Sequence, residues 1–260
     1  MKGVISTIGM SATAKLNGGV LALFTEYMLK IFFLIPMIYL WRSFAAAGAD
    51  LGGMSLESLL AYTCVSSMLG QILNPTTNIV TWNYDGKLVD FYRRPRTVFG
   101  QLIARTVGDW LPELLLYSLP LAIALAAAPR LLGARLAPRS AWFFPSLALT
   151  ASLGFALDFL YTCFVIRLKN AVWMAQRVRA AMISLLSGAV IPFALLPRGL
   201  GAALAALPFG SLAAAPLALY VGSEGPASVI PLQLLWNAAM WPLAFVAWRK
   251  SREVFVSYGG

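Results

Sequence analysis

Residues 84–105 have the sequence YDGKLVDFYRRPRTVFGQLIAR and form the densest block of charge in a chain that is otherwise mostly apolar. The first half predicts a short amphipathic helix, with Lys87 and Asp90 opposite an apolar face of Leu88, Val89, Phe91 and Tyr92. Proline cannot continue a helix and disfavours helix at the residue before it, so this helix should end before Pro95. A second helical pattern begins at Val98. The stretch is either a loop whose arginines sit among anionic headgroups or a helix on which a soluble partner docks.

The composition predicts a membrane protein. Of 260 residues, 60% are hydrophobic and 12% are charged, more apolar surface than a soluble domain of this length can bury. The net charge of +10 could indicate nucleic acid, but Lys and Arg lie in the gaps between apolar segments, which is typical of membrane topology. We therefore expect a lipid bilayer and no nucleic acid as partner.

Enzymatic and metal-binding functions are not expected. The chain has no histidine, the commonest general base and metal ligand, and Cys64 and Cys163 lie in apolar segments as small packing residues. Residues 9–16 (GMSATAKL) depart from a P-loop at Ala14 and Leu16. Thr106 stands where an intramembrane aspartyl protease would need the first glycine of its GxGD motif. No cofactor is expected in this chain.

The apolar segments predict an all-α integral membrane protein with six transmembrane helices, at residues 20–41, 56–80, 110–128, 142–166, 180–196 and 229–248. Residues 1–19 predict a helix lying in the membrane interface. Residues 200–221 are as apolar as a span but are broken by Pro208, Gly210 and Pro216. They predict an external re-entrant helical hairpin between the fifth and sixth spans.

The distribution of basic residues predicts the topology. Six spans place both termini on one side, and 14 of the 20 Lys and Arg residues fall on that side, in residues 1–19, 85–105, 167–179 and the tail. The other side has Arg42, Arg130, Arg135, Arg139 and Arg198. Since positive residues favour the cytosolic side, both termini and residues 84–105 should be cytosolic.

Three ionisable residues, Glu26, Lys30 and Asp158, fall well within predicted spans. Each is costly in a bilayer unless it faces protein or water. Glu26 and Lys30 are spaced i,i+4 and can pair. Lys30 and Asp158 have matching depths, which predicts an interhelical pair with Glu26 as a competitor. Such charges either hold the helix bundle together or contact a transported substrate.

Three stretches together resemble the permease subunits of ABC-2 type exporters, most closely the bacterial daunorubicin-resistance-like group. Residues 86–101 (GKLVDFYRRPRTVFGQ) are similar to the family's cytosolic segment G-x-L-D-x-x-L-x-R-P. Residues 187–222 (SGAVIPFALLPRGLGAALAALPFGSLAAAPLALYVG) resemble the end of the family's fifth span and the L-P-F segment after it. Residues 248–260 resemble its basic tail ending in Gly-Gly. The resemblance covers nearly the whole chain.

This resemblance implies that residues 1–260 form a single ABC-2 type transmembrane domain without its own ATPase site. Two permeases, identical or sister subunits, would associate with two cytosolic ATP-binding subunits that hold ATP and magnesium. The complex would lie in the bacterial inner membrane and export a hydrophobic or amphipathic small molecule, lipid or peptide.

The resemblance also assigns roles to residues. The coupling helix would comprise Lys87, Leu88, Asp90, Phe91, Tyr92, Arg93, Arg94, Pro95 and Arg96. Leu88, Phe91 and Tyr92 would fill a cleft of the partner, and the arginines would reach carboxylates or headgroups. An external gate would contain Pro208, Phe209, Gly210 and Pro216.

Two other functions remain open. An ATP-independent carrier or channel would have paired broken helices in its two halves, whereas in the sequence only the C-terminal half has a strongly broken apolar segment. A non-transporting membrane scaffold fits the intramembrane charges less well.

Overall fold

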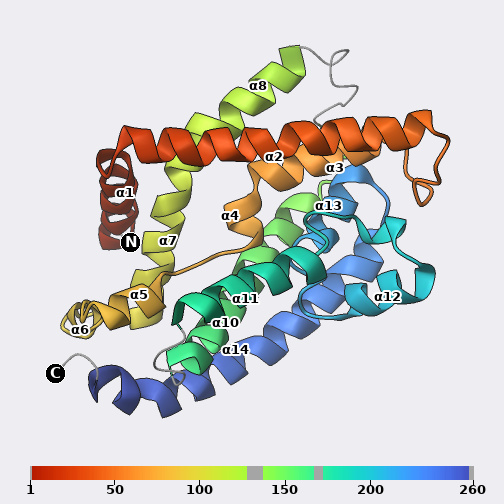
Figure 1. The fold of residues 1–260 in the computed structure, drawn as a ribbon. Helices are drawn as coiled ribbons and strands as arrows, with labels where there is room; N and C mark the ends of the chain where they lie inside the picture. Colours follow the sequence, from red (N-terminus) through yellow and green to blue (C-terminus); the bar gives the residue numbers. More distant parts are fainter. Residues whose placement is uncertain (1, 128–136, 167–171, 258–260) are drawn as a thin grey trace.

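The computed structural model describes residues 2–127, 137–166 and 172–257, and every regular element in those ranges is a helix (Figure 1). This confirms the all-α prediction. Four helical segments are long and apolar enough to cross a membrane: Leu21–Ala46, Val98–Ala127, Phe143–Ile166 and Pro226–Ser251. The protein is therefore membrane-embedded in character, and the total of six spans stays a prediction.

The N-terminal half contains α1 (Lys2–Asn17), α2 (Val20–Ala46), α3 (Leu56–Met68), α4 (Gly70–Leu73), α5 (Ile79–Tyr84), α6 (Val89–Tyr92), α7 (Val98–Glu113), the π-helical turn η1 (Leu114–Ser118) and α8 (Leu119–Ala127). The C-terminal half contains α10 (Phe143–Ile166), α11 (Val172–Leu186), the 3-10 turn η2 (Phe193–Leu195), α12 (Arg198–Ala206), α13 (Ala214–Val221) and α14 (Pro226–Ser257).

The two ends of the molecule differ in what they carry. Figure 1 shows α1, α5, α6 and the last turns of α14 at one end, which we call the α6 end, and α12 at the other, the α12 end. At the α6 end, α1 lies across the direction of α2 (Figure 1). This matches the helix expected at residues 1–19, whose place in a membrane interface stays a prediction.

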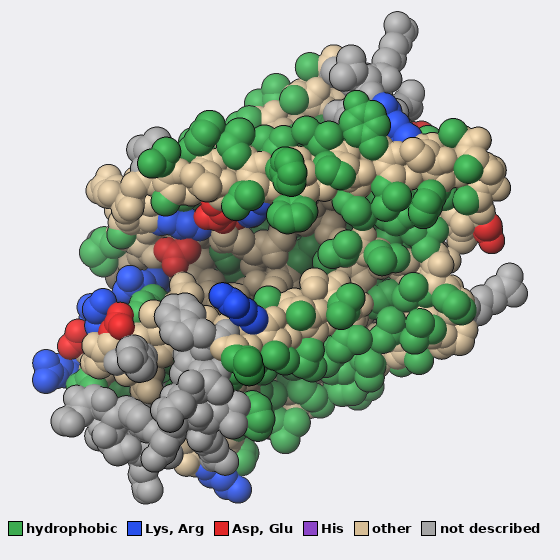
Figure 2. Space-filling view, in the orientation of Figure 1, with side chains coloured by type: hydrophobic (Ala, Val, Ile, Leu, Met, Phe, Trp, Pro, Cys, Tyr) green, Lys and Arg blue, Asp and Glu red, His purple; other side chains and the backbone are tan. Residues whose placement is uncertain are grey.

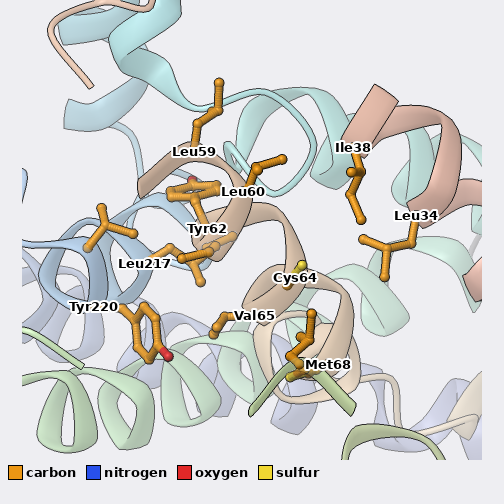
Figure 3. Packing of buried hydrophobic residues seen from close by; sticks show 14 of the residues in the cluster. Leu34, Ile38, Leu59, Leu60, Tyr62, Cys64, Val65, Met68, Leu217 and Tyr220 are labelled. Atoms are coloured by element: carbon orange, nitrogen blue, oxygen red, sulfur yellow. The ribbon is translucent and has the colours of Figure 1, made fainter. Parts of the chain in front are cut away.

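The largest buried cluster joins α3 to α2 and α13 (Figure 3). Leu34 and Ile38 of α2 pack near Leu59 and Leu60 of α3, while Leu217 and Tyr220 contribute from α13. Lipid tails are as apolar as a leucine side chain. Within a bilayer, such contacts therefore stabilise the fold through close packing rather than by removing apolar surface from water. The cluster anchors α13 in the helix bundle.

Polar side chains join α14 to α10. Gln233 is fully buried, and its amide nitrogen lies 3.0 Å from Thr150 Oγ1 and 3.0 Å from the Ser211 carbonyl oxygen. Its side-chain oxygen accepts a hydrogen bond from Ser146 Oγ at 2.8 Å. Hydrogen bonds of this kind between helices help to hold membrane bundles together.

The second predicted span is not one continuous helix. Residues 56–80 contain α3, α4 and the start of α5, and residues 74–78, which we call the break, are not helical. Pro75 lacks an N–H and disfavours helix at Asn74, and Asn78 adopts a left-handed φ of 55°. Residues 56–80 were predicted as one span, and the structure divides them among three helices.

Two other boundaries also differ from the prediction. The third span was expected to start at residue 110, but α7 begins at Val98 and the helix continues through η1 and α8 to Ala127. The fifth span was expected to start at residue 180, but α11 begins at Val172. Arg177 and Arg179 are therefore helical rather than part of a cytosolic loop. Four basic residues used in the topology prediction, Arg130, Arg135, Arg167 and Lys169, lie outside the described residues.

Residues 200–221 form two helices with a turn between them, as the prolines predict. The turn at residues 207–213 separates α12 from α13 and contains Pro208, Phe209 and Gly210. At Gly210 a Cβ would overlap the Leu204 carbonyl oxygen, so only glycine allows this close approach. Pro216 breaks nothing, because it lies in the first turn of α13, where proline is tolerated. The re-entrant placement of the pair in a leaflet stays a prediction.

Candidate functional site

The short helix α6 does not present its apolar face outward. Leu88 and Phe91 are 2% and 6% exposed and pack with Ile79 and Leu102 of the same chain. Phe91 stacks on Trp82 with ring centroids 5.4 Å apart. The prediction that Leu88 and Phe91 fill a partner's cleft was therefore wrong in this structure, where they hold α6 against α5 and α7.

The outward surface is basic. Residues 92–96, which we call the basic turn, are all exposed: Tyr92, Arg93, Arg94, Pro95 and Arg96. Before the turn, Lys87 pairs with Asp85 at 3.1 Å, and within it Arg93 pairs with Asp90 at 3.8 Å. These pairs are exposed and contribute little to stability. The basic turn can meet carboxylates or lipid phosphates.

Gln101 positions the basic turn, a role that the sequence did not indicate. Its side chain is 5% exposed, and its amide nitrogen donates to the carbonyl oxygens of Phe91 at 2.9 Å and Arg96 at 3.0 Å. Thr97 caps the following helix α7 by accepting from the Gly100 N–H at 3.3 Å. The turn is thus held on the N-terminus of a long helix. The only available signal was that Gln101 ends the stretch similar to the exporter permeases.

Asp158 pairs with Arg179 rather than with Lys30. The carboxylate of Asp158 is 3.3 Å from the Arg179 guanidinium, and both residues are at most 9% exposed. Asp158 also accepts hydrogen bonds from the backbone N–H of Thr77 at 3.0 Å and from the Thr77 hydroxyl. Arg179 donates to the Pro75 carbonyl oxygen at 2.9 Å and to Thr76 Oγ1 at 3.2 Å. This buried ion pair supplies the hydrogen bonds that the break lacks.

Lys30 lies between two carboxylates. Its amino group is 2.6 Å from Glu113 and 3.6 Å from Glu26, which confirms the predicted i,i+4 contact with Glu26. Glu113 is 1% exposed, and it ends α7, about 22 Å along the helix from Val98. The third span was predicted at residues 110–128, which put Glu113 near its start, whereas in the structure Glu113 follows a long helical segment from Val98. The π-helical turn η1 follows Glu113 directly, and such turns are frequent at functional sites.

A polar cavity of about 480 Å³ lies between α1, α7 and the break, and we call it the recess. Its lining includes Ser11, Lys15, Gln71, Asn74, Thr76, Asn78, Arg105, Thr106, Asp109 and Trp110. Gln71 also donates to Glu26 at 3.2 Å, so the recess borders the Glu26–Lys30–Glu113 group. Figure 2 shows acidic and basic side chains gathered beside a hollow in an otherwise largely hydrophobic face. No sequence pattern indicates this site, because its residues come from segments that are far apart in the chain.

The predicted gate lies apart from the coupling segment. Phe209 packs near Leu153, Leu212 and Trp236, and Trp236 Nε1 donates to the Ala206 carbonyl oxygen at 3.1 Å. Figure 1 places α12 at the end opposite α6. The predicted site residues therefore form four groups: the coupling segment, Glu26 with Lys30, Asp158 with its partner Arg179, and the turn before α13.

Among the described residues, no group of three or more His, Cys, Asp or Glu side chains could hold a metal ion. No family model, no curated protein and no solved structure matches the chain. The similarity to exporter permeases therefore stays a prediction, and function must be argued from the geometry above.

Proposed function

We propose that this chain is the permease subunit of an ATP-driven exporter of the ABC-2 type. The observation that supports it most is the basic turn at the α6 end, exposed on the outside and held from the inside by Gln101 and by the Phe91–Trp82 stack. A rigidly held, exposed charged turn suits docking of a soluble partner, because little conformational entropy is lost on binding.

In this proposal, two cytosolic ATP-binding subunits dock on the basic turns of two permeases, identical or sister chains. ATP and magnesium are held by the ATP-binding subunits, and no ATP is hydrolysed by this chain. The complex lies in a bacterial inner membrane with both termini in the cytosol.

Two connections would carry movement of the basic turn into the membrane. One is α7, which runs from the turn to Glu113 and its partner Lys30. The other is α5, whose Trp82 stacks on Phe91 and which follows the break held by Asp158 and Arg179. Displacement of the turn would thus change the surroundings of the recess. The cargo is a hydrophobic or amphipathic small molecule, lipid or peptide, and the turn before α13 is the external gate.

An ATP-independent carrier is the second candidate, and one observation favours it. Carriers often have broken helices in both halves of the chain. The N-terminal half has the break at residues 74–78. In the C-terminal half, no α-helix forms at residues 187–197 and 207–213, on either side of α12. The sequence analysis had found a strongly broken segment only in the C-terminal half.

Co-purification tests the proposal and separates the two candidates. The tagged full chain, extracted from its native membrane in mild detergent, should retain an ATP-binding subunit in stoichiometric amount. Arg93→Glu with Arg94→Glu should abolish this retention because it reverses the charge of the docking surface. Lys250→Glu, an exposed charge reversal on α14, is the matched control and should retain the partner. Transport by the purified chain alone, without ATP, would instead establish the carrier.

A further inference from the structure

The break contributes polar residues to the lining of the recess. Asn74, Thr76 and Asn78 line it, and the side-chain carbonyl oxygen of Asn74 is buried without a hydrogen-bond partner among the described residues. Irregular backbone at membrane depth is tolerated where it is buried in protein or lines a water-filled cavity, and broken helices form many transporter substrate sites. The recess is therefore suited to a polar ligand.

One part of the recess is positively charged. Lys15 and Arg105 line it, and neither takes part in any ion pair found in the described part of the chain. Asp109 lies in the same lining and accepts a hydrogen bond from Ser11. Arg105 is exposed and lies over the Trp82 ring at 4.3 Å, which fixes the direction of its guanidinium. The two cations outnumber the one carboxylate, so this part of the recess favours an anionic group of a ligand. The planar guanidinium of Arg105 suits a phosphate group.

The adjoining part is richer in carboxylates. Among the described residues, Lys30 is the ion-pair partner of both Glu26 and Glu113, so two carboxylates meet one basic partner here. Glu113 is almost fully buried, whereas the Glu26 side chain is 38% exposed and contacts Gln71 in the lining. Glu113 lies four residues after Asp109, about one helical turn or ~6 Å further along α7. A cationic group bound beside Glu26 would give the second carboxylate a partner.

The surroundings indicate that the ligand comes from the bilayer. On the face of α2 that carries Glu26, the apolar side chain of Leu29, three residues along the helix, is exposed. Figure 2 shows hydrophobic side chains on both sides of the hollow. Acyl chains can therefore stay in lipid while a headgroup enters the recess.

We propose that the recess binds the headgroup of a zwitterionic phospholipid, with its phosphate at Lys15 and Arg105 and its ammonium at Glu26. The inference deepens the proposed function by naming a cargo class, and it rests on that function only for the claim that the bound lipid is transported. An anionic headgroup that has no ammonium group cannot pair with the Glu26 carboxylate.

Native mass spectrometry of the full chain in detergent tests this without ATP or a partner subunit. The probes are dioleoyl phosphatidylethanolamine, dioleoyl phosphatidylglycerol and water-soluble glycerophosphoethanolamine. We expect one phosphatidylethanolamine per chain, bound about tenfold more tightly than phosphatidylglycerol. Arg105→Gln should weaken both lipids about tenfold, because a charge-assisted contact with the phosphate is lost. Glu26→Gln should remove the preference between them, and it leaves Lys30 paired with Glu113.

Lys250→Gln and Glu224→Gln are the matched controls, because both side chains are exposed and neither lines the recess. Equal affinity for the two lipids in the unmodified chain would overturn the inference, as would an equal loss in a control variant. Displacement of the lipid by equimolar glycerophosphoethanolamine would also overturn it, since the ligand would then come from solution. Lipid binding as expected here, together with failure of an ATP-binding subunit to co-purify from the native membrane, would support this inference and contradict the proposed function.

Discussion

Asp158 and Arg179 show why a charged residue can stay in an apolar helix. Asp158 is 4% exposed near the middle of α10, where an unpaired carboxylate is costly. Its oxygens meet Arg179 and Thr77, while Arg179 also reaches two oxygens of the break. The pair therefore positions non-helical backbone between α4 and α5, besides neutralising two charges.

Removing either partner should leave an uncompensated buried group. We expect Asp158→Asn and Arg179→Met each to destabilise the protein by about 3–5 kcal/mol, and the double variant by clearly less than the sum. Unfolding in detergent, followed by circular dichroism, measures the coupling. The control pair, Asp158→Asn with Lys30→Met, should be additive because the two residues have different partners. Strong coupling between Asp158 and Lys30, with none to Arg179, would contradict the structure.

Some of this pairing could be predicted from the sequence and some could not. Spacing along one helix fixes the contact between Glu26 and Lys30, because i and i+4 share a helix face. Lys30 and Asp158 were predicted to pair because their depths in the membrane match, but depth does not show which helices are neighbours. The partners found in the structure are Glu113, which was placed at the start of the third span, and Arg179, which was placed in a loop, whereas both lie within helices.

Among the elements, α1 is joined to α7 by unusually close packing. A Cβ at Gly108 would overlap the Ile8 carbonyl oxygen, and beside it Ser11 and Lys15 hydrogen-bond to Asp109. The recess depends on this contact because both helices line it.

Gly108→Val should push α1 away from α7, because the new side chain would occupy the space of the α1 backbone. We expect much faster amide hydrogen exchange throughout α1, measured by mass spectrometry on the full chain. Gly9→Val is the matched control, since nothing lies within 4 Å of a Cβ at that helical position. Equal exchange rates in the two variants would show that α1 does not depend on this approach.

Gln101→Leu should loosen the basic turn while keeping a similar side-chain volume. The variant loses two hydrogen bonds, each worth about 1 kcal/mol, which hold the Phe91 and Arg96 carbonyl groups. Trypsin should then cleave after Arg93 and Arg96 several-fold faster under native conditions. Gln176→Leu on α11 is the control. Unchanged cleavage would mean that the Phe91–Trp82 stack alone holds the turn.

The helix at residues 89–92 was predictable, but the direction of its apolar face was not. Amphipathic spacing shows that Leu88 and Phe91 need an apolar neighbour, and it cannot tell the same chain from a partner. Here Trp82, Ile79 and Leu102 provide that neighbour. A helix end near Pro75 follows from the sequence, because proline cannot continue a helix, whereas the full break depends on hydrogen bonds with Arg179 and Asp158 of distant helices.

At the scale of the whole molecule, the basic turn and α12 lie at opposite ends (Figure 1), whereas the turn before α13 packs against α10 close to the break, since Leu212 and Pro75 both lie beside Gly154. The composition and the long apolar segments predicted a helical, membrane-embedded protein, because a soluble domain of this length could not bury so much apolar surface. Helix continuity depended on packing and hydrogen bonds between segments, and for that reason the boundaries of the second, third and fifth spans were misjudged.

The most direct test of the proposed function is site-specific photo-crosslinking in the native membrane. A photoreactive amino acid in place of Arg94 should yield an adduct with a cytosolic ATP-binding subunit. The same amino acid in place of Glu224, exposed beyond α13, should not. Adducts from position 94 that contain only lipid would contradict docking at the basic turn and would favour the carrier.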